Sequence, residues 1–244
     1  MANIHIADDP SQWVQIAVRF IMDSARKALQ VQHRFVLALS GGGTPEPVYE
    51  SLPTIWKEHN LDWHSVQILW GDERCVPLDH PQSNYRMVRE ALLDKIDIPR
   101  SNVHPMRCAD SPSSAAAAYE AELRTLYPQQ SWPIIDLILL GMGADGHTAS
   151  LFPGSPAMHE EKRWVVDNDT SSAEHRRLTL TIPAINHAHA IAFLVTGEDK
   201  AETLRQVLQG KETKDALPAQ RIKPQNGQLH WFLDANAAQY LDLP

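Results

Sequence analysis

The chain has 244 residues, of which 43% are hydrophobic and 21% are charged. This balance is typical of a folded globular protein and excludes a disordered chain. Acidic residues outnumber basic ones by 30 to 22, and the net charge of −8 argues against general nucleic-acid binding, which needs a basic surface. A small anionic ligand is compatible with this charge if basic residues gather locally.

The two cysteines, Cys75 and Cys108, belong to no CxxC motif and to no group with zinc-ligand spacing. This count excludes a disulfide framework and indicates a protein of a reducing compartment, the cytoplasm. The N-terminus lacks the basic and apolar regions of a signal peptide. No segment approaches the run of about 18 apolar residues that a membrane span needs, so we expect no membrane partner.

Helical and strand patterns alternate along the chain. In the first half of the chain, the pattern of apolar residues predicts a helix over 10–30 that Asp9 caps, a strand over 35–39, a helix over 45–58, a strand over 66–70 and helices over 84–96 and 113–127. In the second half, it predicts strands over 134–140, 163–167, 177–181 and 190–195, a helix over 199–209, a strand over 229–233 and a helix over 235–241. This alternation is typical of βαβ units. We therefore expect an α/β fold with a mostly parallel twisted sheet and helices on both faces. No linker-like stretch divides the chain, which predicts a single domain over residues 1–244.

Three unusual sequences follow predicted strands, at the end of the sheet where open α/β proteins bind ligands. The first is Ser-Gly-Gly-Gly-Thr-Pro at 40–45. Glycines allow backbone N–H groups to approach a ligand, and the next helix adds a partial positive charge. Because Ser40 and Thr44 add hydroxyl donors, this favours a phosphate site over an empty glycine turn. The sequence lacks the Gly-Lys-Ser/Thr ending of a Walker A loop.

The second sequence is Gly-Asp-Glu-Arg at 71–74, directly after an apolar strand. Asp72, Glu73 and Arg74 cannot all be buried cheaply. They form either an exposed cluster of ion pairs or part of a site, and the local sequence leaves both alternatives open.

The third sequence runs from Gly141 to Gly154 and begins Gly-Met-Gly-Ala-Asp-Gly-His. It matches GxGxxG formally, but Pro153 and Pro156 would interrupt the helix that a dinucleotide site needs, so that alternative is disfavoured. The other interpretation is a flexible loop that presents Asp145 and His147. A histidine can exchange a proton near neutral pH, and a neighbouring carboxylate can orient it.

The remaining polar groups carry weaker signals. Arg176, Arg177 and Lys200 matter only if a phosphate needs cations, and each is otherwise a solvated charge. His187 and His189 form an HxH without an evident third ligand, so we interpret them as structural or surface residues and expect no metal site.

Taken together, these motifs resemble the 6-phosphogluconolactonase family. The matching stretches are LSGGGTP (39–45), GDERCVPLDHPQSNYRM (71–87) and LGMGADGHTASLFPGS (140–155), with further matches over 176–188, 193–202 and 217–234. The resemblance implies the fold shared with glucosamine-6-phosphate deaminase and ribose-5-phosphate isomerase. It also implies hydrolysis of 6-phospho-D-glucono-1,5-lactone in the oxidative pentose phosphate pathway, without a metal or other cofactor, by a monomer or small homo-oligomer.

The resemblance also implies roles for individual residues, with His147 as the general base that activates water. Asp72, Arg74 and Asp145 would line the sugar end. The phosphate would lie in a cradle of Ser40, Gly42, Gly43 and Thr44, and Lys200 with either Arg176 or Arg177 would neutralise it, Arg176 being preferred.

Two other functions fit a phosphosugar pocket. Related sugar-phosphate deaminase–isomerases carry an acidic residue a few positions after the loop histidine, where this chain has Ser150-Leu151-Phe152. This difference favours the lactonase. A non-catalytic sugar-phosphate-binding regulator would keep the pocket, but it would not need His147.

Overall fold

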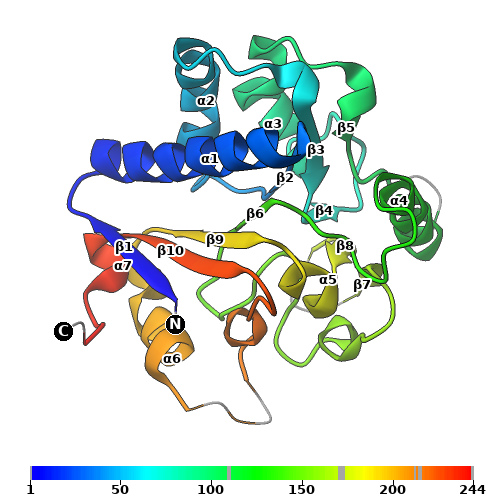
Figure 1. Ribbon diagram of the computed structural model, residues 1–244. Coiled ribbons are helices and arrows are strands. Elements are labelled where there is room, and N and C mark those ends of the chain that lie inside the picture. The colour runs from blue at the N-terminus through cyan, green and yellow to red at the C-terminus, as the bar shows by residue number, and fades with distance from the viewer. Residues whose placement is uncertain (1, 109–110, 170–173, 212, 214–215, 243–244) are drawn as a thin grey trace.

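The computed structural model describes residues 2–108, 111–169, 174–211, 213 and 216–242, which form two β-sheets with surrounding helices (Figure 1). All pairings in the seven-stranded sheet are parallel. Its order is β1 (Asn3–Ala7), β10 (Gln228–Asp234), β9 (Ala190–Val195), β6 (Leu137–Leu140), β2 (Phe35–Leu39), β3 (Val66–Trp70) and β5 (Val103–His104). The smaller antiparallel sheet has the order β4 (Asp72–Arg74), β8 (Arg177–Leu180) and β7 (Val165–Asn168).

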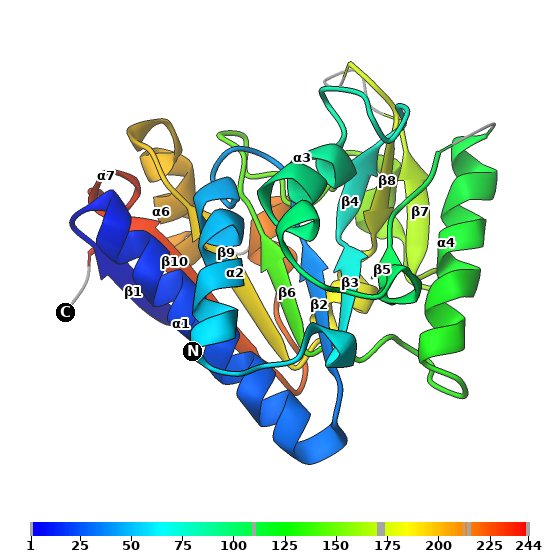
Figure 2. The same ribbon diagram turned by 90° about the horizontal axis from the view of Figure 1, so that it is seen from above.

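Helices cover both faces of the large sheet. The helices are α1 (Pro10–Gln32), α2 (Glu46–Glu58), α3 (Asn84–Ala91), α4 (Pro112–Leu126), α5 (Ile182–Asn186), α6 (Ala201–Gln209) and α7 (Ala235–Ala238). In Figure 1, α1, α2 and α3 lie on one face, and α6 and α7 lie on the other. Figure 2 shows α4 beside β7 and β8 of the small sheet. The predicted α/β fold with a mostly parallel sheet is confirmed.

The apolar runs become the buried centre of the large sheet. Every residue of β2 and β9 is buried. Strands that helices cover on both faces need apolar side chains on both faces, which explains why these runs are continuous instead of alternating. Phe193 of β9 and Trp231 of β10 stack with ring centroids 3.9 Å apart, so they join neighbouring strands on one face. Asp9 caps α1 as predicted, accepting a hydrogen bond of 2.9 Å from the backbone of Gln12.

The order of the strands places a crevice between β2 and β6. The chain continues from β2 to β3 on one side of this pair and from β6 to β9 on the other side. The connections therefore diverge at the carboxyl ends of β2 and β6, which is the point where open α/β sheets bind ligands. The two glycine-rich segments, residues 40–45 and 141–147, both begin there.

Several short elements differ from the sequence-based prediction. Strands β1, β4 and β5 and helix α5 were not predicted, and β4 and β5 contain only three and two residues. Elements of this length have no measurable period, and only their pairing with neighbours defines them. The helix predicted over 84–96 ends at Ala91, followed by a 3-10 turn over Leu93–Lys95, and the strand predicted over 134–140 begins at Leu137.

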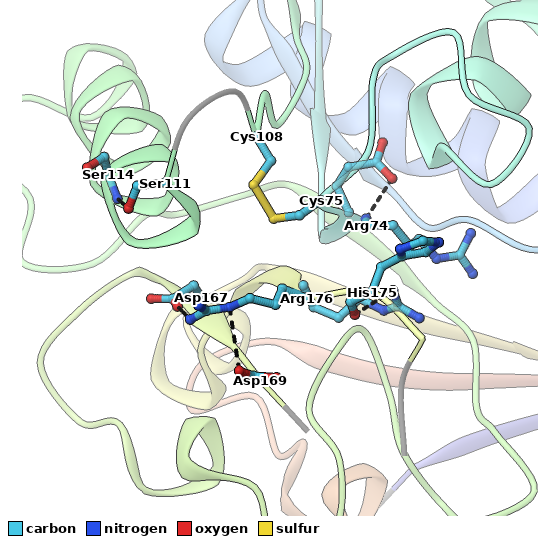
Figure 3. Close-up of a disulfide and its surroundings, with 11 residues drawn as sticks. Arg74, Cys75, Cys108, Ser111, Ser114, Asp167, Asp169, His175 and Arg176 are labelled. Carbon is cyan, nitrogen blue, oxygen red and sulfur yellow. Dashed lines mark hydrogen bonds and ion pairs between the residues drawn. A yellow bond between two sulfur atoms is a disulfide. The ribbon is translucent and has the colours of Figure 1, made fainter. Parts of the chain in front are cut away.

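Cys75 and Cys108 form a disulfide with their Cα atoms 5.0 Å apart (Figure 3). The prediction of two reduced cysteines was therefore wrong for this structure. The cysteines lie 33 residues apart in the sequence, a separation that carries no pairing signal. They come together because Cys75 follows β4 and Cys108 lies just beyond β5, at the edge where the small sheet leaves the large one.

Replacing Cys108 with Ser should lower the free energy of unfolding by about 3–4 kcal/mol, because the bond closes a 33-residue loop and restricts the unfolded chain. Denaturant unfolding of the oxidised protein and of the Cys108→Ser variant measures the difference. A reductant should weaken the wild type and leave the variant unchanged. Equal stability of the two oxidised proteins would contradict the prediction.

Candidate active site

A cavity of about 190 Å³ opens at the carboxyl ends of β2, β3 and β6. The three glycine-containing motifs that follow these strands meet in its wall. The lining residues are Ser40, Gly41, Gly42, Thr44, Pro45, Asp72, Arg74, Asn84, Gly141, Met142, Gly143, His147, Ala149 and Leu194. Residues as far apart in the sequence as Ser40 and Leu194 therefore line one site.

The glycine-rich loop after β2 retains unused hydrogen-bond donors. Gly42 adopts φ of +90°, a backbone conformation that a residue with a side chain rarely adopts. No side chain caps the start of α2, where Pro45 is the N-cap residue. The hydroxyl of Ser40 is buried and has no hydrogen-bond partner among the described residues. Free N–H groups at a helix N-terminus attract an anion, so this end of the cavity is suited to a phosphate.

Two buried tyrosines fix the ends of the strands below the cavity. The hydroxyl of Tyr49 accepts a 3.1 Å hydrogen bond from the N–H of Ser40 and donates one of 2.9 Å to its carbonyl. The hydroxyl of Tyr119 binds the N–H and the carbonyl of Trp70 in the same way, at 3.0 and 3.3 Å. Burial raises the pKa of both tyrosines, so the hydroxyls keep the protons that they donate.

The Gly-Asp-Glu-Arg sequence divides between two faces of β4. Glu73 points away from the cavity and is buried. Its carboxylate accepts hydrogen bonds from Ser83 Oγ (3.1 Å) and from the backbone N–H groups of Arg74, Asn84 and Tyr85 (2.8, 2.7 and 2.8 Å). Burial raises the pKa of Glu73, although these bonds act in the opposite direction. Glu73 therefore holds the start of α3 in place, and its neighbours Asp72 and Arg74 line the cavity.

Asp72 and Arg74 present opposite charges to the cavity. Asp72 is buried, and its Oδ2 accepts a 2.6 Å hydrogen bond from Ser150 Oγ. Arg74 donates to the carbonyl of Gln82 at 2.8 Å. In the part of the chain that the structure describes, Arg74 forms no ion pair with a carboxylate, so its charge is available to a ligand.

His147 is oriented by the carboxylate of Asp145. Asp145 Oδ1 lies 2.6 Å from His147 Nδ1 and accepts a 3.1 Å hydrogen bond from the His147 backbone N–H. Burial raises the pKa of Asp145, but the hydrogen bonds and the imidazole nearby outweigh this effect, and the net pKa is lowered. A charged Asp145 favours a proton on Nδ1, which leaves Nε2 as the acceptor. The His147 ring also packs against Phe152, with the ring centroids 4.7 Å apart.

The sequence analysis predicted that a flexible loop presents Asp145 and His147, and in the structure this segment is a turn with internal hydrogen bonds. Gly143 N–H donates to the His147 carbonyl at 2.9 Å, and Gly146 N–H donates to the Gly143 carbonyl at 3.0 Å. Thr203 of α6 binds the Ala144 carbonyl from outside at 2.6 Å. Turns, and no long helix, follow β6 in residues 141–159, so the dinucleotide-binding alternative lacks the helix it requires.

The predicted cationic residues are arranged unequally around the cavity. Arg177 pairs with Arg74 in the register of β4 and β8, so the two side chains share a face of the small sheet. Burial and the charge of Arg74 lower the pKa of Arg177. Arg176 instead binds Asp167, and its Nε lies 3.8 Å from Asp169 (Figure 3). Neither arginine is among the residues that line the cavity.

Three other predicted residues, Asp145, Lys200 and Gly43, also lie outside the lining set. Lys200 lies at the start of α6 and forms an ion pair with Asp199 at 2.7 Å. Gly43 belongs to the glycine-rich loop, but it does not line the cavity. Thr44 lies close to the end of β9, with its Oγ1 3.5 Å from Thr196 Oγ1, so this side of the loop approaches the segment that leads to Lys200.

Asn84 and Ser150 are site residues that the sequence analysis did not single out. Asn84 lines the cavity, and Ser150 binds the carboxylate of Asp72. Both lie inside sequence stretches that match the family, and this position was the one feature of the sequence that pointed to them. Their types alone do not indicate a role, because buried asparagines and serines usually satisfy backbone groups.

The described residues contain no group of three or more His, Cys, Asp or Glu side chains that could hold a metal ion. His187 Nδ1 lies 2.7 Å from the Pro183 carbonyl, and the His187 ring stacks on Trp132, a structural arrangement. None of the described helices combines the length and the apolar character needed to cross a membrane.

Comparison with known proteins relates the whole chain to one family. Residues 8–231 match the family model described as glucosamine-6-phosphate isomerases/6-phosphogluconolactonase. A 6-phosphogluconolactonase from Synechocystis sp. is 43% identical over 218 residues, which cover 88% of each chain. The solved 6-phosphogluconolactonase from Trypanosoma cruzi superposes with a TM-score of 0.87 at 29% identity, covering 100% of this chain and 98% of that one. A monomeric glucosamine-6-phosphate deaminase shares the fold, with a TM-score of 0.82 at 24% identity over 98% of this chain and 100% of that one.

Replacing Gly143 with Ala should break the bond between Asp145 and His147. A Cβ atom at position 143 would lie 2.1 Å from His147 Nδ1 and 2.7 Å from Asp145 Oδ1, so the ring must move. The ¹⁵N chemical shifts of the His147 imidazole report this change. Gly141→Ala is the matched control, because a Cβ atom there meets nothing within 4 Å. Identical imidazole spectra for the two variants would refute the prediction.

Proposed function

The chain belongs to the family of glucosamine-6-phosphate isomerases and 6-phosphogluconolactonases, and from this membership we propose that it hydrolyses 6-phospho-D-glucono-1,5-lactone to 6-phospho-D-gluconate in the oxidative pentose phosphate pathway. The observation that carries the proposal is that His147, bonded to Asp145, lines a cavity that is also lined by the glycine-rich loop and Arg74. This arrangement supplies a base, a phosphate cradle and a positive charge in one place.

The phosphate of the substrate binds to the loop after β2 in this proposal. The hydroxyls of Ser40 and Thr44 donate hydrogen bonds, the backbone at Gly42 and Gly43 adds N–H donors, and α2 contributes its N-terminal partial charge. Binding through a group that does not react holds the lactone in one orientation, which lowers the entropic part of the barrier.

Arg177 is a better candidate than Arg176, which the sequence analysis preferred, for the arginine that neutralises the substrate phosphate. Arg177 shares a strand face with Arg74, whereas Arg176 already has the carboxylates of Asp167 and Asp169 as partners. Two like charges in register on neighbouring strands repel each other, and a bound anion nearby reduces this repulsion. Lys200 is the second cation in this proposal. It would leave its ion pair with Asp199 and bind the phosphate instead.

Water attacks the lactone carbonyl at C1 while Nε2 of His147 accepts a proton from it. Arg74 and backbone N–H groups of the loop after β6 stabilise the negative charge that develops on the carbonyl oxygen. Asp72 lies beside Arg74 at the sugar end and contacts ring hydroxyls. When the tetrahedral intermediate collapses, the bond from C1 to the ring oxygen breaks, and the imidazolium returns its proton to that oxygen. A positioned base contributes about 10²- to 10⁴-fold and one oxyanion donor about 10²- to 10³-fold. No step in this scheme uses a metal or another cofactor.

The deaminase–isomerase alternative lacks its acidic group in this segment. Ser150 binds Asp72, Leu151 is buried, and Phe152 packs on His147, so residues 150–152 supply no carboxylate. A regulator without turnover would have no use for the oriented imidazole.

We propose a cytoplasmic location, a monomer or small homo-oligomer of one domain, and no nucleic-acid or membrane partner. The net charge of −8 supports the absence of nucleic-acid binding. The disulfide between Cys75 and Cys108 argues against the inference of a cytoplasmic location from reduced cysteines. The redox state of Cys75 in growing cells would test the location, because the cytoplasm keeps thiols reduced.

Replacing His147 with Ala should lower kcat by about 10²- to 10⁴-fold and leave phosphate binding intact, because the ring acts on the water and not on the phosphate. The assay follows freshly generated lactone with a metal chelator present, after subtraction of the spontaneous rate. The wild type should keep its activity in chelator. Near-normal turnover by the variant would exclude His147 as the base, and an inactive wild type that still binds phosphosugars would favour the alternatives.

Replacing Arg177 with Gln should raise KM by about tenfold or more, because a charged hydrogen bond to phosphate contributes about 1.5–3 kcal/mol. Arg176→Gln is the matched control, with the same change of charge at the neighbouring position, and should alter KM by less than about twofold, as surface ion pairs contribute little. The reverse order of effects would restore Arg176 as the phosphate ligand.

A further inference from the structure

Asn84 joins the two halves of the cavity. It is the first residue of α3, it is 2% exposed, and its side chain reaches the cavity between β4 and the glycine-rich loop. Its backbone N–H donates a 2.7 Å hydrogen bond to Glu73, the residue that follows Asp72. The hydrogen bond to Glu73 thus fixes the main chain of Asn84 against β4 independently of its side chain.

The amide nitrogen of Asn84 faces Asp72. Nδ2 lies 2.9 Å from the Asp72 carbonyl oxygen and 3.4 Å from Asp72 Oδ1. Both partners are acceptors, so the nitrogen, and not the oxygen, must point toward them. The second oxygen of the Asp72 carboxylate accepts a 2.6 Å hydrogen bond from Ser150, so each carboxylate oxygen has one donor.

The amide oxygen of Asn84 faces the glycine-rich loop. It is buried and has no hydrogen-bond partner among the described residues. A Cβ atom on Gly41 would lie 1.8 Å from this oxygen and 2.2 Å from Asn84 Cγ, so the carboxamide occupies the space where a side chain at position 41 would stand. Gly41 does not adopt positive φ, so its backbone would accept alanine, and only the contact with Asn84 requires glycine.

We propose that Asn84 is a positioning residue that sets the separation between the phosphate cradle and Asp72. One face of its carboxamide supports the loop at Gly41, and its amide group orients the carboxylate of Asp72. This inference rests on the proposed function for its meaning, because that function assigns the loop to the phosphate and Asp72 to the sugar ring. A shift of either contact would misplace the lactone carbonyl relative to His147.

A double-mutant cycle tests the contact with the loop. Gly41→Ala alone should raise both KM for the lactone and Kd for inorganic phosphate by at least about fivefold, because the new methyl group displaces the loop. In the Asn84→Ala background the methyl group has room, so Gly41→Ala should raise KM and Kd by less than about twofold. Equal effects in both backgrounds would overturn the proposed contact.

A second pair of variants tests the contact with Asp72. Asn84→Asp keeps the shape that supports Gly41 but replaces the donor with an oxygen. It should lower kcat by about tenfold with little change in KM, as expected when a buried acceptor loses its donor. Protonation of the new carboxyl group restores a donor, so the ratio of variant to wild-type kcat should rise as pH falls.

Asn102 provides the matched control for a buried asparagine. Its Nδ2 donates to the carbonyls of His64 and Val66 at 2.9 and 3.0 Å, and it does not line the cavity. Asn102→Asp should lower stability and leave kcat and its pH dependence unchanged. The same kcat loss in both Asp variants would reduce Asn84 to a general stabilising role and overturn the proposal.

These measurements separate the inference from the proposed function. If the wild type does not hydrolyse the lactone, the function fails, and Kd for inorganic phosphate still reports the coupling between positions 41 and 84. If the wild type is active but the cycle is additive and Asn84→Asp is neutral, the function stands and the positioning role fails.

Discussion

The parallel pairing of β2 with β6 is the constraint on which the site depends. These strands meet at Leu37–Leu137 and Ala38–Ile138, in the buried centre of the large sheet. The chain leaves the pair in opposite directions, so the loops that follow the strands border a crevice with no crossing connection above it. The glycine-rich loop and the turn with His147 lie on the two sides of this crevice, and the apolar strand pair directly below the cavity fixes their separation.

A parallel sheet leaves unpaired backbone groups where its strands end, and this protein satisfies them with buried polar side chains. Tyr49 binds both backbone groups of Ser40, and Tyr119 does so for Trp70. Glu73 and Asn84 add further buried polar contacts, Asn84 in the cavity wall itself. A buried polar group costs free energy unless it is bonded, so each of these contacts restricts the site to one arrangement. The side chains that face the ligand are thereby oriented before it binds.

The charge distribution of the site differs from that of the whole chain. The chain carries a net charge of −8, yet Arg74 and Arg177 share one face of the small sheet, and the start of α2 adds a further partial positive charge. Local grouping of this kind can attract a small anion to a protein whose net charge is negative. The small antiparallel sheet is responsible, because its register, and not the order of residues in the sequence, decides which of two consecutive arginines lies beside Arg74.

The sequence by itself determined the α/β alternation, the buried runs over 35–39 and 190–195, and the three motifs that line the cavity, because period and composition are local properties that a core and a glycine turn both require. Only the tertiary structure decided that Glu73 is structural whereas Asp72 faces the cavity, that Arg176 pairs with Asp167, that Cys75 bonds to Cys108, and that Asn84 contacts Gly41. These outcomes depend on strands as short as β4 and on contacts between residues distant in sequence. Such strands and contacts are stabilised by pairing with residues distant in the sequence, so no local sequence pattern predicts them.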